Sequence, residues 1–188
     1  MSELEMLKKN LAERAAAEGL LDVSYRLVDS PLGQLLLAAT EQGMVRVAFA
    51  REGFDTVLDS LAAKVGVRIL ERRAPLDAAA RQLEEYFAHL RSGFELRLDH
   101  RLSSGYRLEV QLALPSIAYG HTVSYKELAL ATGRPAAVRA VGTACATNPL
   151  PIVVPCHRVL RSDGGLGGYL GGMDAKRVLL DLEQDPLG

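Results

Sequence analysis

The stretch that decides how this chain folds and acts is Asn148-Pro149-Leu150-Pro151-Ile152-Val153-Val154-Pro155-Cys156-His157-Arg158-Val159. Its apolar part, 150–154, is predicted to be buried, and a proline then restricts the backbone directly before Cys156 and His157. A thiolate is the reactive form of cysteine, so a histidine or cation that lowers a thiol pKa of roughly 8.5 creates a nucleophile. Adjacent residues in a chain do not face each other by default, so two interpretations of Cys156 and His157 are equally consistent with the sequence. Either the cysteine is a nucleophile activated by the histidine, or it is an inert buried cysteine beside a surface histidine.

The segment that follows is rich in glycine. Six of the twelve residues from 161 to 172 are glycine, which permits close backbone approach to a ligand. The segment lacks the Gly-Lys-Ser/Thr ending of a P-loop and the strand–GxGxxG–helix frame of a dinucleotide site, so no nucleotide cofactor is expected. A ligand-binding loop and a flexible hairpin both fit it. A helix is predicted over 174–182, with Glu183 at its end.

Two predicted helices precede the stretch, over 106–117 and 124–132. The second is opened by a capping box, in which the Ser124 side chain caps the Glu127 amide and the glutamate reaches back. The segment between the two helices contains a glycine that breaks the helical pattern. The region after residue 100 is therefore expected to consist mainly of short helices.

A third predicted helix follows Gly133, which ends the second one. Pro135 fits the first turn of this helix, which is predicted to run to about residue 146. Two short helices joined by a glycine-containing turn form a helix-turn-helix pattern, and its second helix carries Arg139. Many small helical domains contain such a corner, so the pattern by itself is weak.

The first half of the chain has a different pattern, in which strands and helices mix. An amphipathic helix over 3–18 precedes three strand-like runs that resemble an antiparallel meander, followed by a helix, a short strand and another helix. These runs and helices cover 23–28, 34–39, 44–49, 54–65, 67–70 and 77–90. The expected fold class is α/β (α+β), with a helical extension over 1–20, an α/β domain over 21–100 and a helical domain over 101–188.

Length and composition exclude several classes of protein. The chain has 188 residues, 20.3 kDa and a formal net charge of −1, with 48% hydrophobic residues, which is typical of a folded protein. No window approaches the ~18 apolar residues of a membrane span, and residues 1–19 lack a signal-peptide core. Cys145 and Cys156 make neither a disulfide framework nor a four-cysteine zinc site. We expect a cytoplasmic protein, bacterial or archaeal, or a nuclear one in a eukaryote, without a membrane partner.

Charge is distributed unevenly along the chain. Residues 1–100 carry a net charge of −3, and residues 101–188 carry a net charge of +2. Between 101 and 162, seven Lys/Arg accompany only two Glu, a net charge of +5. Such a stretch is able to bind phosphates, but chance clustering on a solvated surface explains the charge pattern at least as well.

Several motifs occur together at a specific spacing. The core is Pro155-Cys156-His157-Arg158-Val159, with Asn148 eight residues before the cysteine. The accompanying residues are Ser30-Pro31-Leu32-Gly33, Tyr86-Phe87, Tyr119-Gly120, Ser124-Tyr125, Leu128-Ala129, Arg139-Ala140-Val141-Gly142, Gly168-Tyr169, Lys176, Leu179-Leu180 and Glu183. This set resembles the O6-alkylguanine-DNA alkyltransferases, strongly over 102–183 and more weakly over 23–98. The resemblance implies a ribonuclease-H-like first domain followed by a winged helix-turn-helix domain.

The resemblance implies a DNA repair protein that extrudes O6-alkylguanine from the duplex, with O4-alkylthymine left open as a second substrate. It implies that Arg139 fills the space left by the base. Tyr125 is expected to press on the 3′ phosphate and to donate a proton to guanine N3. The recognition helix would lie in the minor groove, whose degenerate code suits a search through any sequence. Lys126, Arg134 and Ser162 are assigned to the same DNA surface.

The resemblance also implies the chemistry. Cys156 attacks the O6-alkyl carbon, His157 takes the thiol proton through a water, and Glu183 holds the histidine in the required tautomer. Asn148 braces the turn before the cysteine. The thioether product resists hydrolysis, so the protein is consumed in one turnover and needs no cofactor.

A guanine pocket is implied as well. The backbone carbonyls of Cys156 and Val159 would accept hydrogen bonds from the guanine amino group, and Gly168, Tyr169 and Leu170 would form the lip. Leu170 departs from the family pattern, because many members carry a smaller or polar residue there. A narrower pocket mouth is therefore one expected consequence, and the accepted alkyl groups stay open.

Other departures concern packing and metal binding. Gln111 lies where an apolar or aromatic residue is usual, and Ala118 where proline is usual. Some members bind zinc in the first domain, but residues 1–100 contain no cysteine and only His89 and His100, so no metal is expected. Cys145 is interpreted as a small core residue.

Three other functions stay open at this point. A damage sensor that flips the base without repair would lack the cysteine, so Cys156 argues against it. A transcriptional regulator joined to a zinc domain would need more length and more cysteines. A hydrolase using Cys156 and His157 would turn over a small ester. The favoured partner is double-stranded DNA with alkylated guanine, bound by a monomer, with cooperative binding along DNA left open.

Overall fold

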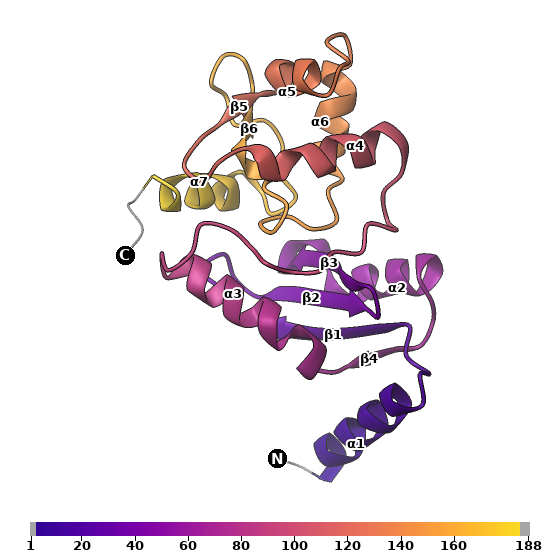
Figure 1. Ribbon diagram of the computed structural model, residues 1–188. Coiled ribbons are helices and arrows are strands. Elements are labelled where there is room, and N and C mark those ends of the chain that lie inside the picture. Colours follow the sequence, from indigo (N-terminus) through magenta and orange to yellow (C-terminus); the bar gives the residue numbers. More distant parts are fainter. Residues whose placement is uncertain (1–2, 185–188) are drawn as a thin grey trace.

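The computed structural model describes residues 3–184, in which a sheet region and a helical region stack one above the other (Figure 1). The sheet region comes from the first half of the chain, and the helical region from the second half. This mixed architecture confirms the predicted fold class. No helix within residues 3–184 is both long enough and apolar enough to cross a membrane.

A four-stranded sheet forms the centre of the first region. Its strands are β1 (Val23–Val28), β2 (Leu35–Thr40), β3 (Gly43–Phe49) and β4 (Ile69–Glu71), in the order β3-β2-β1-β4. β1 pairs antiparallel with β2, and β2 with β3, so the predicted meander is confirmed. β4 is parallel to β1 and starts at Ile69 rather than at residue 67, because Val67 is 81% exposed and lies outside the sheet.

Helices cover both faces of the sheet. Residues of β2 alternate between two buried clusters, one containing Leu83 of α3 (Asp77–Phe87) and the other containing Leu61 of α2 (Phe54–Lys64). α3 ends earlier than the predicted residue 90, because His89 adopts the left-handed conformation with φ of 58°. The sheet is therefore a rigid base, buried on both sides.

β3 is an edge strand, and later parts of the chain cover its open edge. Met44 N donates to Arg97 O at 2.8 Å, and Asp99 N donates to Met44 O at 2.7 Å. Further along the strand, Val47 N donates to Pro149 O at 2.9 Å. An uncovered edge invites pairing with other chains, so this covering protects β3 and also ties the segment around Pro149 to the sheet.

The helical region consists of short helices and two paired strands. They are α4 (Gly105–Ala113), η3 (Leu114–Ser116), β5 (Val123–Ser124), α5 (Tyr125–Ala131), α6 (Val138–Ala146), η4 (Cys156–Arg158), β6 (Val159–Leu160) and α7 (Met173–Leu182). β5 and β6 pair in parallel. The predicted capping box is confirmed, since Glu127 N donates to Ser124 Oγ at 3.1 Å and Ser124 N donates to Glu127 Oε2 at 2.6 Å.

The helix predicted over 106–117 ends as an α-helix at Ala113 and continues as the 3-10 turn η3. Pro115 lies in that turn and has no N–H to extend the α-helix. Gln111, the polar departure on α4, is 2% exposed and donates from Nε2 to Ala144 O at 3.0 Å. Cys145 is 4% exposed, which confirms it as a small core residue.

The third helix of the helical region begins later than predicted. Pro135 lies in the turn before α6, rather than in its first helical turn. Ala137 N donates to Arg134 O at 2.8 Å and closes this turn, so the chain completes a separate bend before the helix begins at Val138. The loop between α5 and α6 is therefore longer than the proline position suggested.

The predicted N-terminal helix is confirmed as α1 (Glu3–Ala17), which lies at the end of the molecule opposite the helical region (Figure 1). It is attached through the buried side chain of Ala12 and an ion pair of 3.1 Å between Glu13 and Arg72. It lies far from the stretch around Cys156.

Candidate active site and DNA-binding face

Asn148 holds the turn that leads to the cysteine. Its side chain is buried, and Nδ2 donates to Val154 O at 2.8 Å and to Cys156 Sγ at 3.2 Å. Its Oδ1 accepts a hydrogen bond from Leu150 N at 3.0 Å. Ile152, inside the same turn, adopts a φ of 73°, which is uncommon for a β-branched residue. One amide thus bridges the start of the turn, its end and the sulfur.

Cys156 begins the 3-10 turn η4 and is 2% exposed. Burial raises the pKa of this thiol to about 11, although the Asn148 hydrogen bond and the charge of Lys176 both lower it. The thiol is therefore protonated near pH 7, and two of its neighbours are placed to stabilise the thiolate once it forms.

His157 is fully buried, so the alternative of a surface histidine is wrong. Its Nε2 lies 2.8 Å from Glu183 Oε1. Burial lowers the pKa of His157, and the hydrogen bond that His157 donates to Glu183 opposes this shift only in part. With an ionised Glu183 accepting from Nε2–H, Nδ1 is the acceptor nitrogen, and within residues 3–184 this buried atom has no hydrogen-bond partner.

Glu183 is the centre of a buried set of side chains, which we call the Glu183 cluster: Tyr86, His157, Arg158 and Glu183. Tyr86 donates from its hydroxyl to Oε1 at 2.5 Å, and Arg158 donates from Nη2 to Oε1 and from Nε to Oε2, both at 2.9 Å. Burial alone would raise the pKa of Glu183, but the hydrogen bonds from His157 and Arg158 lower it to about 2. Glu183 is thus a carboxylate at neutral pH.

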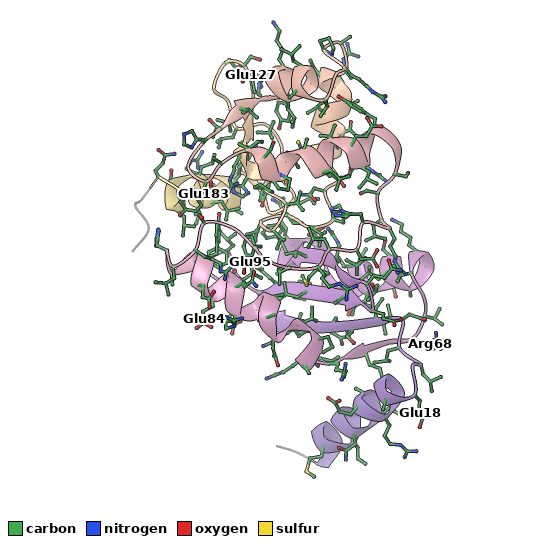
Figure 2. All side chains as sticks on the ribbon, viewed as in Figure 1. Glu18, Arg68, Glu84, Glu95, Glu127 and Glu183 are labelled. Carbon is green, nitrogen blue, oxygen red and sulfur yellow. The ribbon has the colours of Figure 1, made fainter. Side chains whose placement is uncertain are left out.

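The Glu183 cluster joins the two regions of the molecule. Figure 2 shows Glu183 at the end of α7, at the level where the helical region meets the sheet region. Tyr86 comes from α3 of the sheet region. Arg158 also donates to Ile117 O at 2.6 Å, and Gly120 N donates to Glu183 Oε2 at 3.2 Å. The helix end, the turn after α4 and the first region therefore meet at one carboxylate.

Sequence reasoning missed the roles of three residues. Arg158 and Lys176 belong to the matching motifs, and Tyr86 belongs to the matching part of the first domain, but the sequence predicts no contact for any of them. Lys176 is fully buried and donates from Nζ to Val159 O at 2.6 Å and to Leu166 O. The burial of Lys176 could have been predicted, because it is a charged residue on the apolar side of a predicted helix. No local pattern indicates the contact of Tyr86 with Glu183.

The predicted pocket residues differ in solvent exposure. Val159 is fully buried, Gly168 is exposed, and Tyr169 and Leu170 are half-buried. The Tyr169 ring packs edge-on against His157, with centroids 6.4 Å apart and planes at 85°. Tyr169 therefore lies beside the buried histidine.

Tyr125 lies against the glycine-rich loop. Gly167 has a φ of 65°, and a Cβ there would come 2.5 Å from the Tyr125 hydroxyl, so the loop reaches the ring only because this residue is glycine. Burial raises the pKa of Tyr125 to about 12. At neutral pH its hydroxyl is consequently a proton donor.

The side chains assigned to DNA come from α5, the turn between α5 and α6, α6 and the turn after β6, and we call these residues the basic face. Its residues are Lys126, Arg134, Arg139 and Ser162, and all four are exposed. A cavity of about 570 Å³ opens beside it, lined in part by Ser124, Lys126, Arg161 and Ser162. The Glu183 cluster and the basic face therefore differ completely in solvent access.

The basic stretch counted in the sequence does not all reach this surface. Arg158 is buried in the Glu183 cluster, so it is unable to meet a phosphate. Arg134 pairs with Glu109 at 3.3 Å and its guanidinium lies 4.4 Å from the Tyr106 ring centroid. Because Arg158 is buried, the net charge of the segment overstates the charge available for binding, whereas the exposed Arg134 is able to exchange Glu109 for another anion.

No three His, Cys, Asp or Glu side chains within residues 3–184 gather closely enough to hold a metal ion. The absence of a metal or other cofactor stays a prediction from the sequence.

Both regions of the chain match models of one protein family. Residues 106–185 match the family model "6-O-methylguanine DNA methyltransferase, DNA binding domain", and residues 23–100 match "6-O-methylguanine DNA methyltransferase, ribonuclease-like domain". The chain is 40% identical over 167 residues to the methylated-DNA--protein-cysteine methyltransferase of Methanosarcina barkeri, covering 87% of this chain and 98% of that protein.

Two solved structures from Mycobacterium tuberculosis are similar over most of the chain. The O6-methylguanine methyltransferase has a TM-score of 0.76 and 37% identity, covering 86% of this chain and 93% of that one. A structure described as OGT in complex with DNA has a TM-score of 0.75 and 37% identity, covering 86% and 92%.

Proposed function

The chain belongs to the 6-O-methylguanine DNA methyltransferase family, and we propose that it repairs O6-alkylguanine in duplex DNA by moving the alkyl group to its own Cys156. The observation that carries the proposal is a buried cysteine held by Asn148 directly before a His157–Glu183 pair. The reaction consumes the protein in a single turnover, because water does not hydrolyse the thioether product.

The transfer is a displacement at carbon. A bond forms between Cys156 Sγ and the alkyl carbon, and the bond from that carbon to guanine O6 breaks. The thiol proton passes through a water to His157, while the Tyr125 hydroxyl donates a proton to guanine N3 as the base leaves. The tyrosinate then recovers a proton from the histidinium, so the net result is an S-alkyl cysteine and an unmodified guanine.

Burial and the neighbouring polar groups explain why the Cys156 thiol stays protonated and unreactive without substrate. The pKa of Cys156 is raised to about 11, and burial lowers the pKa of His157, so proton transfer is unfavourable in the free protein. Lys176 and Asn148 stabilise the thiolate only as the sulfur gives up its proton. Glu183 acts as a positioning residue, because it fixes the tautomer of His157 and stabilises the imidazolium that forms.

DNA is the partner, and the basic face is its binding surface. Arg139 enters the duplex and fills the space of the extruded base, and Tyr125 presses on the phosphate 3′ of the lesion. Lys126, Arg134 and Ser162 contact phosphates and position the duplex without reading sequence. The protein binds as a monomer, and residues 21–100 and 101–188 act as its two domains.

The pocket places guanine between the buried cysteine and the glycine-rich lip. The carbonyls of Cys156 and Val159 face the guanine amino group. The Val159 carbonyl already accepts from Lys176, but a carbonyl oxygen has two lone pairs, so it is able to accept a second hydrogen bond. Gly168, Tyr169 and Leu170 close the opening toward bulk solvent, so that only the water that relays the thiol proton remains beside the sulfur.

Mass spectrometry tests the proposal. The protein is incubated with a duplex that carries one O6-methylguanine, and the intact mass and a peptide map are measured. One methyl group on the peptide that contains Cys156 is the expected result. Cys156→Ser is the control, and it is expected to bind the duplex without gaining mass. A wild-type protein that binds the lesion and never gains a methyl group would favour the damage sensor instead.

A further inference from the structure

The edge strand of the first domain touches both walls of the pocket. On one side, Val47 N donates to Pro149 O at 2.9 Å, and Arg46 Nη1 donates to the same oxygen at 3.3 Å. Pro149 directly follows Asn148, the residue that holds Cys156 Sγ. The first domain thereby anchors the turn before the cysteine.

On the other side, Phe49 lies behind the lip. Phe49 ends β3 and is 3% exposed. Its ring packs against the Tyr169 ring, with centroids 5.6 Å apart and planes at 65°. A Cβ at Gly171 would come 2.7 Å and 2.8 Å from two atoms of the Phe49 ring, so the lip approaches this ring more closely than any other residue type would permit.

The position of Phe49 is itself fixed. Phe49 N donates to Glu52 Oε1 at 2.9 Å, and Glu52 pairs through its other oxygen with Arg46. The neighbouring Arg51 guanidinium lies over Gly172, where a Cβ would clash with it. The end of β3 and the turn after it thus form a firm support for the segment from Tyr169 to Gly172.

We propose that Phe49, in the first domain, is a specificity-determining residue that limits the size of the alkyl group by supporting Tyr169 from behind. The Tyr169 ring contacts both His157 and Phe49, so a movement of Tyr169 toward β3 requires Phe49 to move as well. A small alkyl group fits without movement of the lip. A bulky group requires the lip to retract, and the contact with Phe49 resists that movement.

This inference rests on the proposed function, and rate constants for two substrates test it. Single-turnover transfer is measured for wild type, Phe49→Leu and Phe49→Ala, with duplexes that carry O6-methylguanine or O6-benzylguanine. Loss of the ring is expected to raise the ratio of the benzyl rate constant to the methyl rate constant by about tenfold. This is the lower end of the discrimination between substrates that a small difference in an apolar pocket provides. Gly171→Ala adds a Cβ that would come 2.7 Å from the Phe49 ring, so it leaves the lip less room to retract and is expected to lower the ratio.

The control is Leu61→Ala, which removes a buried side chain from the core cluster on the opposite face of the sheet. It is expected to lower the melting temperature and leave the rate ratio unchanged, since general destabilisation affects both substrates alike. Equal ratios in wild type, Phe49→Leu and Gly171→Ala would overturn the inference. A wild-type protein that transfers neither group would instead overturn the proposed function.

Discussion

In the Glu183 cluster, the Arg158 and Glu183 side chains pair while only 7% and 1% exposed, whereas on the basic face Arg134 and Glu109 pair while 55% and 52% exposed. The buried pair belongs to a network in which the carboxylate also accepts from Tyr86 and His157. The exposed pair lies among solvated side chains. The same two residue types therefore have different tasks in the two places.

Burial gives these two charged pairs different roles. In a buried network each charge depends on its partner, so removal of one leaves another uncompensated and the fold weakens. On the basic face, water and salt replace any lost partner, so the charges remain available to a phosphate. The proposed site assignments therefore couple chemistry and stability in the Glu183 cluster, and they make DNA binding separable from both.

The largest expected effect is that of Glu183→Gln, compared with Glu109→Gln on the surface. Glu183→Gln leaves the buried Arg158 without a counter-charge, and we expect it to lower the free energy of unfolding by about 3 kcal/mol or more. Glu109→Gln removes an exposed pair and should change stability by less than about 0.5 kcal/mol. Urea denaturation of both variants measures the two free energies of unfolding, and equal losses would show that burial does not distinguish the two ion pairs.

Acid should weaken the buried cluster selectively. The pKa of Glu183 is lowered from 4.5 to about 2 in the folded protein, so this group contributes stability above pH 4.5. That contribution is lost as the pH falls from about 4.5 to about 2, and it amounts to about 3 kcal/mol at 1.36 kcal/mol per pKa unit.

His157 adds a second loss of stability, because burial lowers its pKa in the folded protein. This loss begins near the ordinary histidine value of 6.5, where the unfolded chain starts to bind a proton that the folded chain does not bind. Unfolding free energies of wild type and Glu183→Gln across this pH range isolate the carboxylate. If both proteins lose stability in parallel below pH 4.5, Glu183 is not the group responsible.

The sequence predicted best what local patterns determine. The Ser124–Glu127 capping box, the meander and the buried 150–154 run all follow from the spacing of neighbouring residues. It failed where distant residues meet, because no local pattern places Tyr86 within 2.5 Å of Glu183, 97 residues later. The charge count failed for the same reason, since Arg158 counts as a basic residue whether it faces solvent or a buried carboxylate.

Arg139→Ala separates extrusion of the base from chemistry. Arg139 is exposed on α6, and we expect its loss to leave the melting temperature unchanged. Transfer from an O6-methylguanine duplex should slow by about 30-fold, because extrusion costs a few kcal/mol and Arg139 compensates for part of it. Transfer from free O6-benzylguanine base, which needs no extrusion, should keep the wild-type rate. A loss that is equal for both substrates would place Arg139 in the chemistry instead.

The smallest effect is expected for Lys126→Gln. At this solvated position, a phosphate contact would contribute to DNA affinity only through the release of counterions. Lys126 is exposed in the first turn of α5, beside the cavity of about 570 Å³. If it neutralises one phosphate, the slope of log affinity against log salt should become shallower by about 0.9. The melting temperature and the rate on free base should not change. Fluorescence anisotropy with a labelled duplex between 50 and 200 mM salt, roughly the range in which such slopes are resolved, measures the slope. An unchanged slope would remove Lys126 from the proposed phosphate contacts and leave Tyr125, Arg134, Arg139 and Ser162 as the proposed DNA contacts.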